Sequence, residues 1–209
     1  TLSTIVLYCL NNLFFNKSAL KAAAQNDDSE VIYTLLLKEN EIPEHVFRDN
    51  KKLKHIVIPP NVTSIREFAF TQSSLKQIVI PSSLTSIEDY AFYGCQFLKQ
   101  LIIPTSLTSI ENHVFYLCSS IEQFLIPPSV TKIGNYSFFS CSSLLQIVIP
   151  SSVTAIGNYA FSGCKSVKHL SIAFGKIIGE SSFGHLTSLE QLIIPSSLTS
   201  INDSAFIEC

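Results

Sequence analysis

The fold is decided by residues 98–118, which read LKQLIIP at 98–104, TSLTSI at 105–110 and VFYLC at 114–118. Variants of this segment fill most of the chain, and each contains an isoleucine that is followed five residues later by a phenylalanine. The pairs recur every 22 or 23 residues and are Ile42/Phe47, Ile65/Phe70, Ile87/Phe92, Ile110/Phe115, Ile133/Phe138, Ile156/Phe161, Ile178/Phe183 and Ile201/Phe206. A repeat of this length predicts a solenoid, in which each unit buries one face against its neighbours.

Each repeat also contains a short alternating segment that ends in proline. In one copy, Ile56 and Ile58 are expected to point into the core, while His55 and Val57 point outward. Proline ends the segment because it has no backbone N–H to donate to a neighbouring strand. Stacked segments predict one parallel sheet with strands about 4.8 Å apart, joined by right-handed connections. An irregularity is expected at Ala173, where the proline and one residue are missing.

Residues 1–41 lack the repeat, and we predict helices at 18–26 and 29–39. The alanines at 22–24 favour helix, and the apolar residues at 31, 32, 35 and 36 form one helical face. This segment resembles a single ankyrin repeat, although Asp27 stands where that family usually has glycine. We favour a helical cap over an ankyrin unit, because the terminal repeat of a solenoid must cover its open edge.

A family resemblance rests on IGNYSF at 133–138, CSSL at 141–144 and IVIPSSVTAI at 147–156. These motifs resemble the BspA-like leucine-rich repeat, and the resemblance extends over residues 42–209. It implies an α+β fold, namely a right-handed leucine-rich-repeat solenoid of about eight 22–23-residue repeats with a parallel sheet on one face. The short helical cap would precede it. The resemblance also implies secreted or cell-surface proteins of bacteria and mucosal protozoa, which act in adhesion and carry no catalytic residues.

Composition points away from nucleic acids and membranes as partners. The 209-residue chain has a formal net charge of −2, so it lacks the basic balance of a nucleic-acid-binding protein. The longest apolar stretch, residues 2–15, is interrupted by Asn11 and Asn12 and is too short to span a bilayer. Because the chain stops in mid-repeat at Cys209, we expect it to be part of a longer protein, and the open solenoid edge could support oligomers.

No motif for a metal, a cofactor or a catalytic nucleophile is recognised. Five of the six cysteines share one repeat position, three residues after the phenylalanine: Cys95, Cys118, Cys141, Cys164 and Cys209. Thiols from successive repeats would lie in a row and not in a tetrahedron, so a zinc site is not predicted. A buried column of free thiols is favoured over disulfides, because parallel side chains do not point at one another.

The outward strand positions are the predicted binding site. The residues assigned to partner binding are Val57, Val79, Gln100, Ile102, Gln123, Leu125, Gln146, Val148 and Ile193. Exposed apolar residues flanked by polar ones are typical of protein-binding surfaces, but packing of β-branched residues along the sheet is an alternative explanation. A flanking column varies in charge and consists of Lys54, Lys76, Lys99, Glu122, Leu145, Lys168 and Glu190.

The leading functional hypothesis is a non-enzymatic protein–protein recognition module. We expect a secreted or cell-surface adhesin or surface antigen that binds host, matrix or other extracellular proteins. Two alternatives are an intracellular, cytoplasmic scaffold and the targeting domain of a larger protein. No cofactor and no metal are expected, and neither nucleic acid nor membrane insertion is part of the hypothesis.

Overall fold

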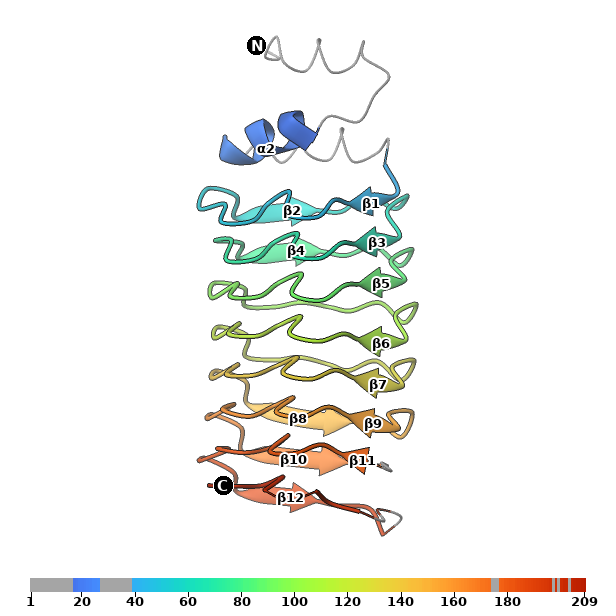
Figure 1. The fold of residues 1–209 in the computed structure, drawn as a ribbon, viewed down its shortest axis with the longest axis vertical. Helices are drawn as coiled ribbons and strands as arrows, with labels where there is room; N and C mark the ends of the chain where they lie inside the picture. The colour runs from blue at the N-terminus through green and yellow to red at the C-terminus, as the bar shows by residue number, and fades with distance from the viewer. Residues whose placement is uncertain (1–16, 27–38, 174–176, 197, 199, 203) are drawn as a thin grey trace.

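The computed structural model describes residues 17–26, 39–173, 177–196, 198, 200–202 and 204–209. They form a solenoid whose turns stack along the long axis, with the helix at its N-terminal end (Figure 1). The elements are α2 (Lys17–Gln25), β1 (Glu41–Ile42), β2 (His55–Val57), β3 (Ser64–Ile65), β4 (Gln77–Val79), β5 (Ser86–Ile87), β6 (Ser109–Ile110), β7 (Lys132–Ile133), β8 (Gln146–Ile149), β9 (Ala155–Ile156), β10 (His169–Ile172), β11 (Ile177–Ile178) and β12 (Gln191–Ile193).

The strands run in two lines along the solenoid, and every pairing is parallel. One line contains β2, β4, β8, β10 and β12 and is formed by the alternating segments, but it is divided into two parallel sheets, β2–β4 and β8–β10–β12, where one sheet was predicted. The second line consists of two-residue strands that end at the repeat isoleucine (Figure 1). Alternation does not reveal this second line, because two residues are too few to show a period.

In the middle of the chain the first line has no regular strand. There Gln77, Gln100 and Gln123 are joined only by isolated parallel bridges. Phe124 occupies the inward position that Leu101 and Ile147 take in the adjacent repeats. Its ring is half-buried and packs edge-on against the core phenylalanines of the preceding repeat and of its own repeat, with centroids 5.2 and 4.6 Å apart respectively.

The core is a stack of phenylalanine rings, one from each repeat. Neighbouring ring centroids lie 4.9 to 5.6 Å apart from Phe47 to Phe206. The rings from Phe47 to Phe183 are fully buried, together with the repeat isoleucines from Ile42 to Ile178, whereas Ile201 of the last repeat is exposed. The phenylalanine column is therefore structural, and burial of such side chains stabilises each interface between repeats by about 2 kcal/mol or more per ring.

Serine and threonine hydroxyls hold the turns between repeats. Ser129 donates a hydrogen bond to the carbonyl oxygen of Leu107 at 2.7 Å, and Ser152 donates one to Val130 at the same distance. Thr154 likewise reaches the carbonyl of Thr131, at 3.1 Å. The hydroxyls of these turn residues thus add hydrogen bonds between successive repeats, and at Thr131 the hydroxyl of Thr154 supplements the backbone bond that the Thr154 N–H already makes.

The cysteines form the predicted column of free thiols, of which four are buried. Each sulfur donates to the carbonyl oxygen of the phenylalanine in the preceding repeat, as Cys118 does to Phe92 at 3.1 Å and Cys141 to Phe115 at 3.2 Å. Burial raises the pKa of Cys95, and likewise that of Cys164, from an ordinary value of 9.0 to about 12. The buried thiols are therefore protonated, and they act as small packing groups.

Helix α2 confirms the helix predicted at 18–26. Its buried side chains Leu20, Ala23 and Ala24 belong to the same apolar cluster as Ile42 and Leu53 of the first repeat. The helix predicted at 29–39 lies almost wholly outside the described residues, so the choice between cap and ankyrin unit stays a prediction. The irregularity expected at 173 falls next to residues 174–176, which also lie outside them.

Candidate functional site

An apolar column lies exposed along the first strand line. We name it the apolar stripe, and its members are Val57, Val79, Ile102, Leu125, Val148 and Ile193. Ile102 and Leu125 are the most exposed, at 84% and 76% of the full side-chain value. The stripe arises because every repeat places the same outward position of its strand in register with the next, as Val57 pairs with Val79. Ser171, half-buried, stands at this position in one repeat.

The predicted glutamines stand beside the stripe. Gln100, Gln123 and Gln146 are exposed, in one column with His55, Gln77, His169 and Gln191. The structure thus brings all the sequence-predicted site residues onto one face, which we call the strand face. Their role in binding stays a prediction.

The strand face is hollowed between its fourth and sixth copies. A depression of about 610 Å³ is lined by Glu122, Gln123, Phe124, Leu125, Leu145, Gln146, Val148, Lys168 and His169. Leu145 is exposed here, although it was assigned to the flanking column and not to the partner-binding residues. It stands where other repeats have a charged residue. This replacement of a charged residue by leucine is the sequence signal that could have identified Leu145 as part of the site. A smaller hollow of about 130 Å³ lies between β2 and β4.

On the other side of each repeat, at the turn that carries the core phenylalanine, the side chains stack on one another. We name this column the aromatic ladder, and its members are His45, Phe68, Tyr90, His113, Tyr136 and Tyr159. Neighbouring ring centroids lie 4.4 to 5.0 Å apart, and every member has a positive φ of 54 to 59°. Sequence reasoning missed the ladder, although aligning the third residue after each repeat isoleucine would have found it.

An amide ladder runs beside the aromatic one. The Oδ1 atom of Asp89 accepts the backbone N–H of Asn112 at 2.9 Å, and Asn112 accepts that of Asn135 at the same distance. Asn135 and Asn158 continue the series to Glu180, at 2.8 and 3.0 Å. The oxygens of these side chains are occupied within the solenoid, so the ladder is structural.

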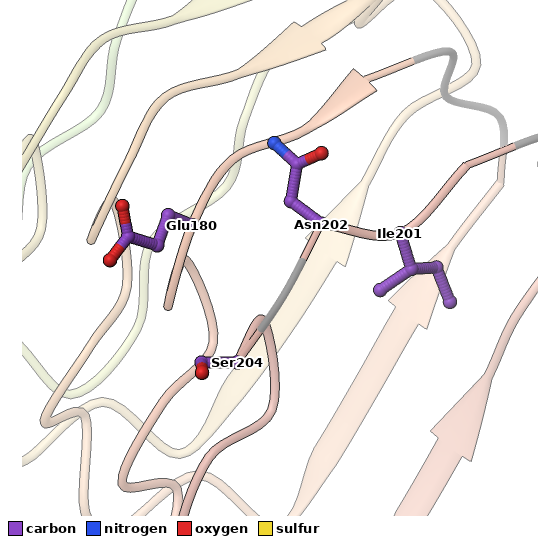
Figure 2. A pocket seen from close by; sticks show the side chains of 4 residues that line it. All are labelled: Glu180, Ile201, Asn202 and Ser204. Carbon is purple, nitrogen blue, oxygen red and sulfur yellow. The ribbon is translucent and has the colours of Figure 1, made fainter.

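A hollow of about 450 Å³ lies at the C-terminal end of the turn side, lined by Glu180, Ile201, Asn202 and Ser204 (Figure 2). It lies where the aromatic ladder stops, because Ser204 occupies the position that holds Tyr159 two repeats earlier. Among the described lining residues Glu180 is the one carboxylate, and it accepts a hydrogen bond from the Tyr159 hydroxyl at 3.1 Å. Those residues place neither a histidine nor a second carboxylate beside the Ser204 hydroxyl, so they form no recognisable catalytic arrangement.

Within the described part of the chain, His, Cys, Asp and Glu side chains are nowhere grouped in threes or more so as to hold a metal ion. Among the helices described there, none has the length and apolar character needed to cross a membrane.

Comparison with known proteins agrees with the observed architecture. A family model described as BspA type leucine rich repeat region matches residues 40–168 and 171–209 in six copies. A leucine-rich repeat protein from Bacteroides ovatus ATCC 8483 is 30% identical, with a TM-score of 0.71, over 75% of this chain and 43% of that one. The T. pallidum leucine-rich repeat protein is 27% identical, with a TM-score of 0.67, over 71% of each chain.

No match is found among curated proteins, and the chain spans less than half the length of the Bacteroides ovatus protein. The family model nevertheless covers nearly every repeat, and the two solved structures share the stacked fold. The chain therefore belongs to the BspA-type leucine-rich repeat family.

Proposed function

We propose that the chain is a non-enzymatic protein-recognition module whose strand face binds a protein partner. The observation that carries the proposal is the exposure of the apolar stripe between polar columns, a pattern typical of protein-binding surfaces. Ladder packing of β-branched residues accounts for the valines, but it does not account for Leu125. That side chain is 76% exposed and hence makes little contact with neighbouring strands.

The chemistry of the described residues supports a role in binding. The four buried thiols are held protonated, and a protonated thiol is a poor nucleophile. His169 on the strand face has no cysteine or serine among the residues that line the same hollow. The face therefore offers apolar contacts and hydrogen bonds, which suit recognition.

The proposal places the protein at the cell surface or outside the cell, where it would act as an adhesin for host or matrix proteins. The family resemblance supports this location. The four buried thiols fit it as well as they fit a cytoplasmic scaffold, because burial protects them from oxidants in either compartment. Labelling of intact cells with a membrane-impermeant reagent tests the location, and labelling only after lysis would contradict it.

Binding is tested with a triple variant of the stripe, Ile102→Lys/Leu125→Lys/Val148→Lys. The matched control is Ser82→Lys/Thr105→Lys/Ser151→Lys, which adds the same charge at exposed positions just after the strand prolines. Both variants and the native chain are titrated against immobilised extracellular matrix proteins and whole host cells. We expect the stripe variant to bind at least about a hundredfold more weakly, because central apolar anchors dominate protein interfaces.

The control variant should bind like the native chain, and all three proteins should show the same circular dichroism and urea midpoint within experimental error. Equal binding by the stripe variant and the native chain would remove the strand face from the proposal. A loss shared by the stripe variant and the control would assign the effect to net charge.

A further inference from the structure

Lysine residues form a row at the N-terminal half of the strand face. Lys54, Lys76 and Lys99 immediately precede the His/Gln column in three consecutive repeats. Backbone hydrogen bonds join them directly, since Lys76 N–H donates to the Lys54 carbonyl at 2.7 Å and Lys99 N–H donates to the Lys76 carbonyl at 3.3 Å. The row therefore follows the solenoid axis with a spacing of about 4.8 Å per residue.

The apolar stripe runs parallel to this row. Val57, Val79 and Ile102 follow the three lysines by three residues along the strand, a separation of about 10 Å. The hollow of about 130 Å³ lies between β2 and β4, where it is lined by His55 and Gln77 of the hydrogen-bonding column and by Val57 and Val79 of the stripe. The first three repeats thus present a cationic row, a hydrogen-bonding column and an apolar row side by side.

The positive charge of Lys76 and Lys99 is not balanced by a carboxylate of the described residues. Lys76 and Lys99 are exposed, and among the described residues no carboxylate lies within 4.0 Å of either ammonium group. The carboxylates of Glu41 and Glu88 face Arg66 instead, from the second strand line. Like charges that stand opposite each other on neighbouring strands are destabilising, so an anionic partner here would relieve repulsion.

The same column changes character in the later repeats. It continues as Glu122, Leu145, Lys168 and Glu190, and Lys168 pairs with Glu190 at 2.9 Å. The C-terminal half of the strand face is thus close to neutral and more apolar, with the hollow of about 610 Å³ at its centre. The cationic character is confined to the first three repeats.

We propose that these three repeats bind an acidic, partly apolar polypeptide segment in an extended conformation. The inference rests on the proposed function and specifies the chemistry of the partner. Side chains of an extended segment alternate between its two sides, so carboxylates on one side can reach the lysine row while apolar side chains on the other cover the stripe. A sulfated polysaccharide would satisfy the lysines but leave Val79 and Ile102 uncovered, which favours a polypeptide.

The test uses a short fluorescein-labelled peptide of alternating glutamate and valine, followed by fluorescence anisotropy. The charge-reversed variant is Lys76→Glu/Lys99→Glu, and its matched control is Lys21→Glu/Lys132→Glu, whose lysines are an exposed residue of α2 and an exposed residue of β7. We expect the first variant to bind about tenfold more weakly or worse, and the control to bind like the native chain. Raising the ionic strength from about 0.05 to about 0.3 M should weaken binding to the native chain.

Three further measurements make the proposal refutable. The variant Val79→Ser/Ile102→Ser should also weaken binding, and a peptide of alternating lysine and valine should not bind. Heparin provides the competing outcome. If heparin binds as well as the glutamate–valine peptide, and if its binding needs the lysines but not the apolar pair, the proposal is overturned in favour of a general polyanion site. Failure of the native chain to bind the glutamate–valine peptide would overturn it as well.

These outcomes are separable from those of the proposed function. Suppose that the glutamate–valine and lysine–valine peptides bind equally, and that binding needs the apolar pair but not the lysines. The strand face then remains a protein-binding surface, and the preference for acidic partners is wrong. If the triple stripe variant retains matrix binding, the proposed function is wrong whatever the peptides do.

Discussion

The strand face and the turn side of the solenoid are built by the same repetition, yet they differ in how far the repeats cover one another. In the aromatic ladder each ring is stacked on its neighbour, as Tyr136 is on Tyr159 with centroids 4.9 Å apart. On the strand face, Ile102 and Leu125 occupy equally regular positions but remain largely exposed. A column made by repetition is therefore structural where stacking covers its members, and it is available to a partner where stacking leaves them uncovered.

The backbone reinforces this contrast. Members of the aromatic ladder have positive φ values, a conformation that costs L-residues about 1 kcal/mol or more each. Stacking of aromatic pairs contributes about 0.5–1.5 kcal/mol, so the rings offset the strain of the turn that carries them. The strand face bears no comparable strain among its named residues, and its side chains can serve binding without an effect on folding.

The largest expected effect is a loss of stability when a side chain of a buried column is truncated, compared with truncation in an exposed column. Phe115→Ala should lower the free energy of unfolding by about 3–5 kcal/mol, because it leaves a cavity between two stacked rings. Its matched control, Ile102→Ala, should change stability by less than about 0.5 kcal/mol, since that side chain is already in water. Urea unfolding followed by circular dichroism measures both, and similar losses would refute the contrast.

An intermediate effect is expected from the thiol column at alkaline pH. Unfolded thiols lose their protons above about pH 9, whereas the folded thiols of Cys95 and Cys164 retain theirs up to about pH 12. The free energy of unfolding should therefore fall as the pH rises through this window, by about 1.4 kcal/mol per pH unit for each thiol. Below about pH 9 these two groups should contribute no pH dependence.

The measurement compares urea unfolding at about pH 9 and about pH 10 for the native chain and for Cys95→Ala/Cys164→Ala. The variant is less stable at neutral pH because its two thiol hydrogen bonds are lost, but its stability should decline less steeply with pH. Tyrosines and lysines titrate in both proteins and cancel in the comparison. Equal slopes would show that burial does not hold the thiols protonated.

The smallest effect concerns the aromatic ladder. Tyr136→Ser introduces the residue that naturally occupies the equivalent position at Ser181, and should cost about 1 kcal/mol through the loss of two stacked contacts. Binding of partners to the strand face should not change. A loss of binding with unchanged stability would mean that the turn side takes part in recognition, and would break the distinction between the two sides.

The repeat could be predicted from spacing because burial acts at fixed sequence intervals. The phenylalanine column, the buried thiols and the outward positions of Ile102 and Leu125 all follow from the period and the pleat of the strand. Three features did not follow from the spacing. The two-residue strands are too short to have a period, and the aromatic ladder mixes histidine, phenylalanine and tyrosine. The exposure of Leu145 at the large hollow depends on how side chains of adjacent repeats pack.

The sequence alone shows which residues share a column, because a constant repeat length brings equivalent positions into register. Which columns are covered and which lie open is seen only in the folded solenoid, because coverage depends on distances between side chains of adjacent repeats. Tyr90 and His113 stack at 4.4 Å, whereas the side chains from Leu125 to His169 leave a hollow of about 610 Å³. The same register therefore produces a closed turn side and an open strand face.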